Sequence, residues 1–310
     1  MLKYLKRGPG FYGYLWRLTG PIALQNLITF SLGLIDTLMV SWLGNTQMAA
    51  VTTANVPVFL LISIVFGVQS GLGILVSQYW GKKDMESISR AIGVAAMLGT
   101  GITLVLALVL FLWPVQIMDL LSNKHELSVL GAPYLKLIGF SYVFNMLSSI
   151  YVSAMRSAEN SGFGMKLFGV STLLNTGMNY LLIFGKCGLP ALGIQGAAIA
   201  TLLSQCVSFA ILLACFLRRK SAVRLHIGQV SRKAEVYARI IKTGMPSFCR
   251  QSLASVATVL LNVNAAVYGD AAVAAMSVVG RIFMFVFSFM LGFGQGFQPV
   301  AGYNYGAGDN

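Results

Sequence analysis

Residues 67–84 read GVQSGLGILVSQYWGKKD, and residues 292–309 read GFGQGFQPVAGYNYGAGD. Glycines recur in the two stretches at a constant separation along the chain, equal to the separation of Gly67 from Gly292. We call this separation the repeat offset. Glycine and proline set turns and close helix contacts, so a match in these residues means more than a match in hydropathy. The repeat predicts that one structural unit occurs twice, and its matching positions are Pro21 and Pro246, Gly67 and Gly292, Gly71 and Gly296, and Gly81 and Gly306.

The composition is that of a membrane protein. Of the 310 residues, 56% are hydrophobic and only 10% are charged, and the mean hydropathy is +0.75. A soluble domain has about 25% charged residues, so most of the folded surface is expected to face lipid. The net charge of +13 lies mainly in short segments between apolar stretches. This distribution is typical of cytoplasmic loops and argues against nucleic-acid binding.

Helices of about 20 apolar residues span a bilayer. On this measure the sequence contains eight spans, and it lacks the alternating strands of a membrane barrel. We therefore predict an all-α polytopic membrane protein. The predicted spans are residues 18–43, 49–79, 91–113, 133–155, 165–184, 192–217, 242–268 and 271–301.

Basic residues set the predicted orientation. Alternating loops place the basic N-terminal segment, residues 1–17, on the same side as residues 218–242, which contain eight basic residues. Cytoplasmic loops are enriched in Lys and Arg, so the N-terminus is predicted to be cytoplasmic. The part of the second segment around Val236, Ile240 and Ile241 is either a short helix on the inner membrane surface or a solvated basic loop.

The repeat divides the chain into three predicted parts. Residues 1–217 form an N-terminal six-helix bundle, residues 218–241 a cytoplasmic linker, and residues 242–310 the first two helices of a second bundle. Because six spans lead from one repeat to the next, both repeats begin on the same side of the membrane. Two parallel bundles flanking a cavity are a recurring transporter plan. We expect twelve helices in all, of which this chain holds eight, with the second bundle incomplete.

Several motifs resemble one known family. The segments GLGILVSQYWGKKD and GFGQGFQPVAGYNYGAGD, with MRSAEN after the fourth span and GIQGAAIAT at the sixth, are similar to signatures of the multidrug and toxic compound extrusion (MATE) family. GMPSFCRQSLASVATVLLN and GYNYGA most resemble its MepA-like bacterial multidrug exporters. The resemblance implies a monomeric antiporter of the bacterial plasma (inner) membrane. Such a protein exports cationic drugs in exchange for protons or sodium ions and needs no cofactor and no metal.

Asp36 is the acidic residue that lies well inside a predicted span. An intramembrane carboxylate either binds a proton or cation or is hydrogen-bonded for packing alone. Asn175 and Asn179 are four residues apart and share a helix face, which predicts a polar pocket with Asp36. The resemblance implies that Asp36 couples ion and drug, and that Thr201 completes this ion-coupling and substrate-binding site. Asn179 fills a slot that is acidic in some family members, so we favour protons over sodium.

Other interpretations stay open. A lipid-linked precursor flippase would favour a cavity lined with Arg and Lys, whereas the basic residues of this chain lie outside the first six spans or near their ends. A truncated, inactive chain is a further alternative, because alternating access needs two complete bundles. An enzyme is excluded, because the spans hold no carboxylate pair, metal cluster or nucleophile with a base. Arg250 and Arg281 lie inside predicted spans without an assigned role, and Gln295 and Gln298 are candidates to face the cavity.

Overall fold

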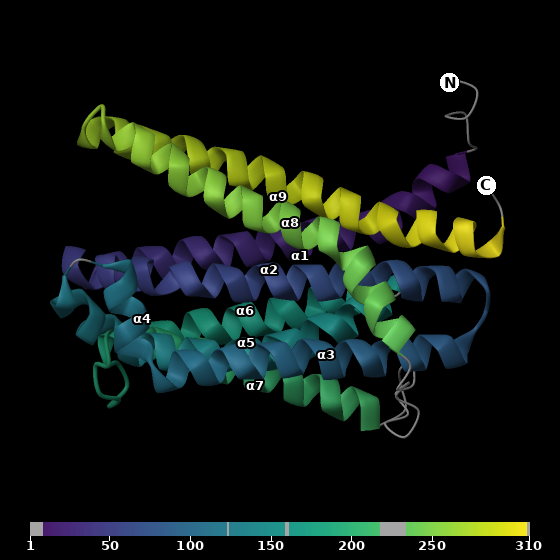
Figure 1. The fold of residues 1–310 in the computed structure, drawn as a ribbon, viewed down its shortest axis with the longest axis horizontal. Helices are drawn as coiled ribbons and strands as arrows, with labels where there is room; N and C mark the ends of the chain where they lie inside the picture. Colours follow the sequence, from purple (N-terminus) through teal and green to yellow (C-terminus); the bar gives the residue numbers. More distant parts are fainter. Residues whose placement is uncertain (1–8, 123, 159–160, 218–233, 309–310) are drawn as a thin grey trace.

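The computed structural model describes residues 9–122, 124–158, 161–217 and 234–308. These residues form nine α-helices and no strands (Figure 1). In chain order the helices are α1 (Pro9–Ser41), α2 (Asn45–Gly81), α3 (Met85–Leu112), α4 (Pro114–Leu121), α5 (His125–Ser157), α6 (Ser161–Phe184), α7 (Ile194–Leu217), α8 (Ala234–Ala266) and α9 (Asp270–Ala307).

Most of these helices are long and apolar enough to cross a membrane. Within the described part of the chain, seven meet that measure: α1, α2, α3, α5, α6, α7 and α9. Helix α4 has only 8 residues, and α8 is not among the seven although it has 33 residues. The prediction of an all-helical membrane protein is thus confirmed. A crossing by α8, which would give the eight predicted spans, stays a prediction.

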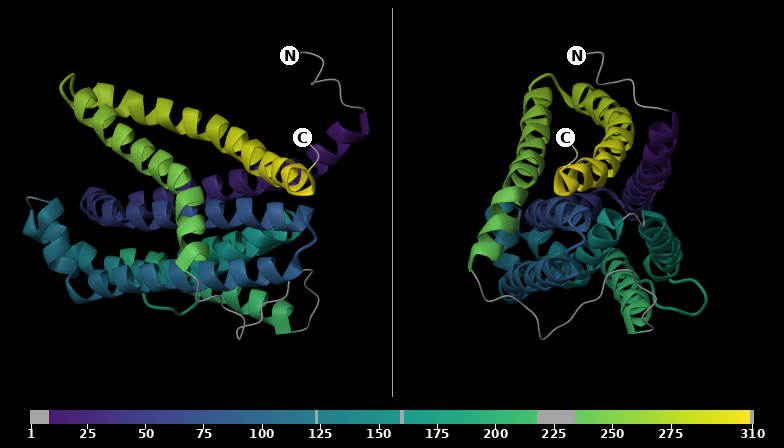
Figure 2. Two further views of the ribbon diagram at one scale, coloured as in Figure 1. Left: turned by 45° about the vertical axis from the view of Figure 1, so that its right-hand side comes forward. Right: turned by 90° about the vertical axis from the view of Figure 1, so that its right-hand side faces the viewer.

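The helices form two groups. Helices α1 to α7 pack as one bundle, in which α5 contacts α2, α3, α6 and α7. Helices α8 and α9 form a hairpin, with α8 against α2 and α9 against both α1 and α2. Figure 2 shows that this hairpin meets the bundle at one end and diverges from it toward its own turn. We call the meeting end, where α2 reaches Gly81 and α9 reaches Gly306, the junction end.

The sequence repeat is visible in the helix boundaries. Helix α8 begins and ends one repeat offset after α1, and α9 begins one repeat offset after α2. Pro21 and Pro246 lie inside α1 and α8 at equivalent positions. Gly44, which precedes α2, has a φ of 117°, and Gly269, which precedes α9, has a φ of 94°. Side chains are strained at such positive φ angles, so both equivalent turns require glycine.

Other glycines of the repeat lie where two helices touch. A Cβ atom on Gly71 of α2 would collide with the backbone of Ile240 and Gly244 in α8. A Cβ atom on Gly296 of α9 would lie 2.5 Å from the side chain of Thr19 in α1. Gly244 is itself the repeat equivalent of Thr19. The α2–α8 and α1–α9 crossings are therefore equivalent under the repeat, and small residues let the backbones approach closely.

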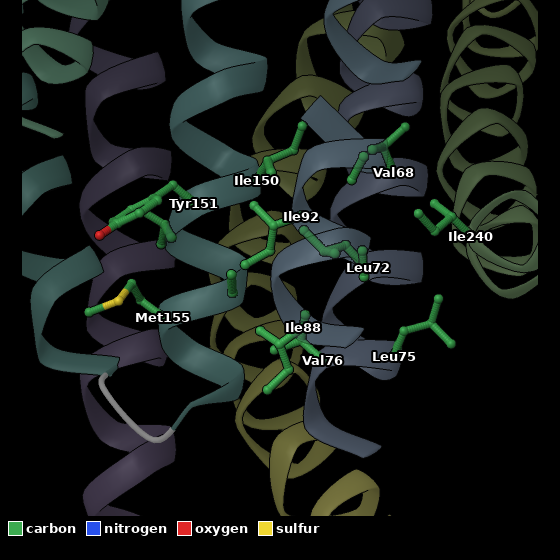
Figure 3. Close-up of a cluster of buried hydrophobic side chains, with 14 of the residues drawn as sticks. Val68, Leu72, Leu75, Val76, Ile88, Ile92, Ile150, Tyr151, Met155 and Ile240 are labelled. Atoms are coloured by element: carbon green, nitrogen blue, oxygen red, sulfur yellow. The ribbon is translucent and has the colours of Figure 1, made fainter. Parts of the chain in front are cut away.

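A buried apolar cluster lies beside the α2–α8 crossing. In Figure 3, Leu72 of α2 and Ile92 of α3 lie in this cluster with Ile240 of α8. Ile240 is only 1% exposed. Ile240 belongs to the predicted linker, of which residues 234–241 are helical and form the first turns of α8, with Ile240 packed against α2. The rest of the predicted linker, residues 218–233, lies outside the described residues.

Candidate functional site

Asp36 lies against the polar face of α6. Helices α1 and α6 pack together, and Asn179 Nδ2 donates a hydrogen bond of 2.5 Å to Asp36 Oδ1. The same amide nitrogen donates a second hydrogen bond, of 3.1 Å, to Asn175 Oδ1. The amide nitrogen of Asn175 in turn donates a 3.2 Å hydrogen bond to Thr201 Oγ1 of α7. The four residues proposed from the sequence thus form one connected group across three helices.

Burial distinguishes the members of this group. The side chains of Asn175 and Asn179 are 1% and 0% exposed, whereas Asp36 is half-buried. The carbonyl oxygen Asn179 Oδ1 has no hydrogen-bond partner among the described residues. A buried acceptor without a donor is unfavourable unless a proton donor or a cation satisfies it. The group therefore presents a carboxylate next to an amide that still has an acceptor available.

Asp36 faces a cavity of about 430 Å³ inside the first bundle. We call it the Asp36 cavity. Asn175 and Asn179 are not among the described residues that line it, so these asparagines lie behind the carboxylate. Its walls come from α1, α2, α5 and α7, and their polar residues are Asp36, Thr37, Thr52, Asn55, Tyr134, Tyr142 and Thr201.

Part of this wall was not predicted from the sequence. Tyr134 of α5 donates a hydrogen bond of 3.3 Å from its hydroxyl to Asn55 Oδ1 of α2. Tyr142 lines the same cavity. The two tyrosines are eight residues apart and so share a helix face. This spacing could have indicated that both line the same wall. The contact with Asn55 joins residues 79 positions apart, and no local pattern predicts such a contact.

A second cavity, of about 370 Å³, lies between the bundle and the hairpin. We call it the hairpin cavity. Its lining includes Arg156 of α5 and Arg250 of α8, with Gln295 and Gln298 of α9. Arg156 donates to Gln295 Oε1 at 3.0 Å, and Gln298 Nε2 donates to the backbone oxygen of Ser70 in α2 at 3.1 Å. The hairpin is thus joined to the bundle by polar contacts at this cavity.

Arg156 differs most from its expected position. The predicted fourth span ends at residue 155, which leaves Arg156 in the loop that follows it. Helix α5 instead continues to Ser157, and Arg156 is only 5% exposed. The helix extends because Ser153 and Ser157 donate hydrogen bonds of 2.8 and 3.0 Å to backbone oxygens of α2. Arg281, the other basic residue of interest, is exposed on α9 and does not line the hairpin cavity.

Polar cavities within a bundle of membrane-length helices define a class, that of multi-pass membrane proteins with internal polar sites. The model of the MatE family matches residues 21–181 and 246–310. Because this match covers well over half of the sequence, the chain belongs to the MatE family, whose members are transporters and not enzymes.

Individual relatives agree with this assignment. The chain is 27% identical over 272 residues to the probable multidrug resistance protein YoeA of Bacillus subtilis, covering 86% of this chain and 58% of that protein. It is 25% identical over 307 residues to the multidrug export protein MepA of Staphylococcus saprophyticus, covering 98% of this chain and 66% of that protein. The fold matches a crystal structure of MATE in complex with MaD5, with a TM-score of 0.88 and 22% identity over 95% of this chain and 66% of that one. The chain thus spans 58% to 66% of the length of these relatives.

Proposed function

We propose that this chain belongs to a secondary antiporter that exports cationic drugs or toxic organic compounds in exchange for protons or sodium ions. The names of the relatives, a multidrug resistance protein and a multidrug export protein, support export of drugs. The observation that carries the coupling proposal is the placement of Asp36 on the wall of a 430 Å³ cavity. An intramembrane carboxylate in a cavity is typical of ion and substrate pathways.

Exchange follows from the single charge of Asp36. A proton, a sodium ion or a cationic drug can each neutralise the carboxylate, and binding of one weakens binding of the next. This negative coupling between ligands is the thermodynamic basis of antiport. The amide of Asn179 donates to the carboxylate and so stabilises its charged form once the ion leaves. We favour a proton, because Asp36 is the one carboxylate among the described residues that line the cavity.

Alternating access is the proposed mechanism of transport. Helices α8 and α9 follow α1 and α2 at the repeat offset. We propose that they are the first two helices of a second six-helix bundle in a twelve-helix, monomeric protein. Rocking of parallel bundles exposes a central cavity to each side in turn. The junction end would be cytoplasmic, in agreement with the basic segments 1–17 and 218–242, which begin and follow the first bundle in the sequence. The protein would reside in the bacterial plasma membrane.

Accumulation of a fluorescent cationic dye in cells that lack their own exporters tests this function. The chain, its Asp36→Asn variant, an Asp119→Asn variant and an empty vector are compared at equal membrane insertion. Asp119 is the matched control, because it lies exposed on α4 beside His125. We expect the chain and Asp119→Asn to lower dye accumulation and Asp36→Asn to abolish that effect. Accumulation equal to that of the empty vector would reject export by this chain.

A further inference from the structure

The hairpin cavity carries positive charge on two separate parts of the fold. Arg156 comes from α5 in the bundle, and Arg250 comes from α8 in the hairpin. Among the described residues that line this cavity, none is an aspartate or a glutamate. Like charges that face one cavity repel each other. Arg250 is exposed, so solvent compensates its charge, whereas Arg156 is buried.

The described protein groups supply little of that compensation. The guanidinium of Arg156 has five N–H donors, and its one described hydrogen bond is the 3.0 Å bond to the neutral amide of Gln295. The ion pairs among the described residues are those of Arg90 with Glu86 and of His125 with Asp119, and neither involves the cavity. A charged side chain that is only 5% exposed and faces a cavity needs a counter-ion or solvent there.

The rest of the lining combines apolar side chains with neutral polar ones. Phe66 of α2 and Phe287, Met290 and Leu291 of α9 share the cavity with the arginines. Its volume of about 370 Å³ lies in the range of pockets for small organic molecules, about 300–1,000 Å³. Aromatic and aliphatic side chains beside convergent polar groups are typical of a site that holds a hydrophobic body by one polar end.

We propose that the hairpin cavity binds an organic anion, a carboxylate, sulfonate or phosphate group on an apolar body. Arg156 and Arg250 bind the anionic group from opposite sides, while Phe66 and Phe287 contact the apolar body. Because the two arginines belong to the bundle and the hairpin, the anion draws these two parts together. The site is separate from the Asp36 cavity and opposite in charge, so this protein handles anionic as well as cationic compounds.

Binding of a dye pair that differs in charge tests the proposal. The purified chain in phosphatidylcholine nanodiscs is titrated into fluorescein, an anion at neutral pH, and into a cationic rhodamine ester with the same ring system, and fluorescence anisotropy is recorded. We expect Arg250→Gln to weaken fluorescein binding by about tenfold or more, the usual effect of losing a charge-assisted hydrogen bond. Rhodamine binding is expected to be no weaker in this variant.

Two further variants keep the test decisive. Arg281→Gln removes the same charge from the same hairpin outside the cavity and is expected to leave fluorescein binding unchanged. Arg156→Lys keeps the charge but loses the planar donors, and we expect weaker binding with the fold intact. Equal fluorescein affinity in the chain and Arg250→Gln, or an equal loss in Arg281→Gln, would overturn the proposal.

The source of the anion is assigned by competition in the same nanodiscs. Displacement of fluorescein by glycerol 3-phosphate assigns the cavity to lipid headgroups, and displacement by 1-naphthoate alone assigns it to soluble aromatic anions. Displacement by neither contradicts the proposal. The result is independent of the proposed cation export, because Asp36→Asn is expected to leave fluorescein binding unchanged. A chain that exports no dye from cells could therefore still bind the anion.

Discussion

Gly81 of α2 and Gly306 of α9 each face the helix that carries the other. A Cβ atom on Gly81 would collide with the backbone of Tyr303 and Ala307, and a Cβ atom on Gly306 would collide with the backbone of Gln78. Tyr303 is the repeat equivalent of Gln78, as Gly306 is of Gly81. The α2–α9 crossing at the junction end is thus symmetric under the repeat.

Alanine at either of these two glycines should loosen the crossing. The added methyl group meets backbone atoms, which cannot rotate away, so each of Gly81→Ala and Gly306→Ala is expected to destabilise the protein by about 1–3 kcal/mol. Thermal unfolding of the purified chain in one detergent measures the change as a lower midpoint temperature.

The control for this pair is Gly280→Ala. Gly280 lies on α9, and a Cβ atom there would meet nothing within 4 Å. Alanine also favours a helix over glycine by up to about 1 kcal/mol. We expect an unchanged or higher midpoint temperature for this variant. A loss in Gly280→Ala equal to that in Gly306→Ala would show that the close crossing does not account for the effect.

Removal of the amide that supports Asp36 should impair transport. Asn179→Ala deletes the donor that lies 2.5 Å from the carboxylate, and a hydrogen bond to a charged group contributes about 1.5–3 kcal/mol. Dye export is expected to fall by roughly tenfold or more. Asn264→Ala is the control, because the described hydrogen bond of its amide is to the backbone of its own helix, at Leu260 O. Unchanged export by Asn179→Ala would exclude a supporting role for this amide.

Acid should weaken the start of α3. The Asp84 side chain accepts a 3.0 Å hydrogen bond from Ser87 N, and the hydrogen bonds from Ser87 lower the pKa of this carboxyl. A folded-state pKa below the unfolded value stabilises the protein above the ordinary aspartate pKa of about 3.9, and the contribution is lost as pH falls through the lowered value.

Two variants separate the cap from its charge. Asp84→Ala is expected to cost about 1 kcal/mol at neutral pH, and Asp84→Asn much less, because asparagine caps a helix about as well as aspartate. Thermal unfolding between neutral pH and about pH 3 should show a smaller acid-induced loss for both variants than for the chain. An identical loss in all three proteins would place the acid sensitivity elsewhere.

The repeat explains how much of the fold was predictable. Proline and glycine positions depend on backbone geometry, so their recurrence indicated equivalent helices before any packing was known. Gly67 packs against Phe248, and Gly292 packs against Ala23. Gly292 lies one repeat offset after Gly67, and Phe248 lies one repeat offset after Ala23, so the two contacts are equivalent. The grouping of Asp36 with Asn179 was also predictable. The position of Asp36 within its span indicates its depth in the membrane, and the four-residue spacing of Asn175 and Asn179 puts both on one helix face. Their role in ion coupling stays a prediction.

What could not be predicted depends on contacts between distant segments. Hydropathy ended the fourth span before Arg156, because an arginine is unfavourable in lipid. In the structure the residue is buried among protein groups, and Gln295 from α9, 139 positions away, accepts its hydrogen bond. Asn26 of α1 donates to the same amide oxygen at 3.3 Å. One glutamine therefore connects three helices, and the local periodicity of the sequence does not predict such a contact.

The reciprocal crossings have a consequence for how the molecule would open. The hairpin rests on α1 through Gly296, and its other helix meets α2 through Gly71. Both crossings are close, so the hairpin leaves the bundle only when α8 parts from α2 and α9 parts from α1. Under the proposed alternating access, these two equivalent crossings would therefore open together. A substitution at one crossing would then affect the opening of both.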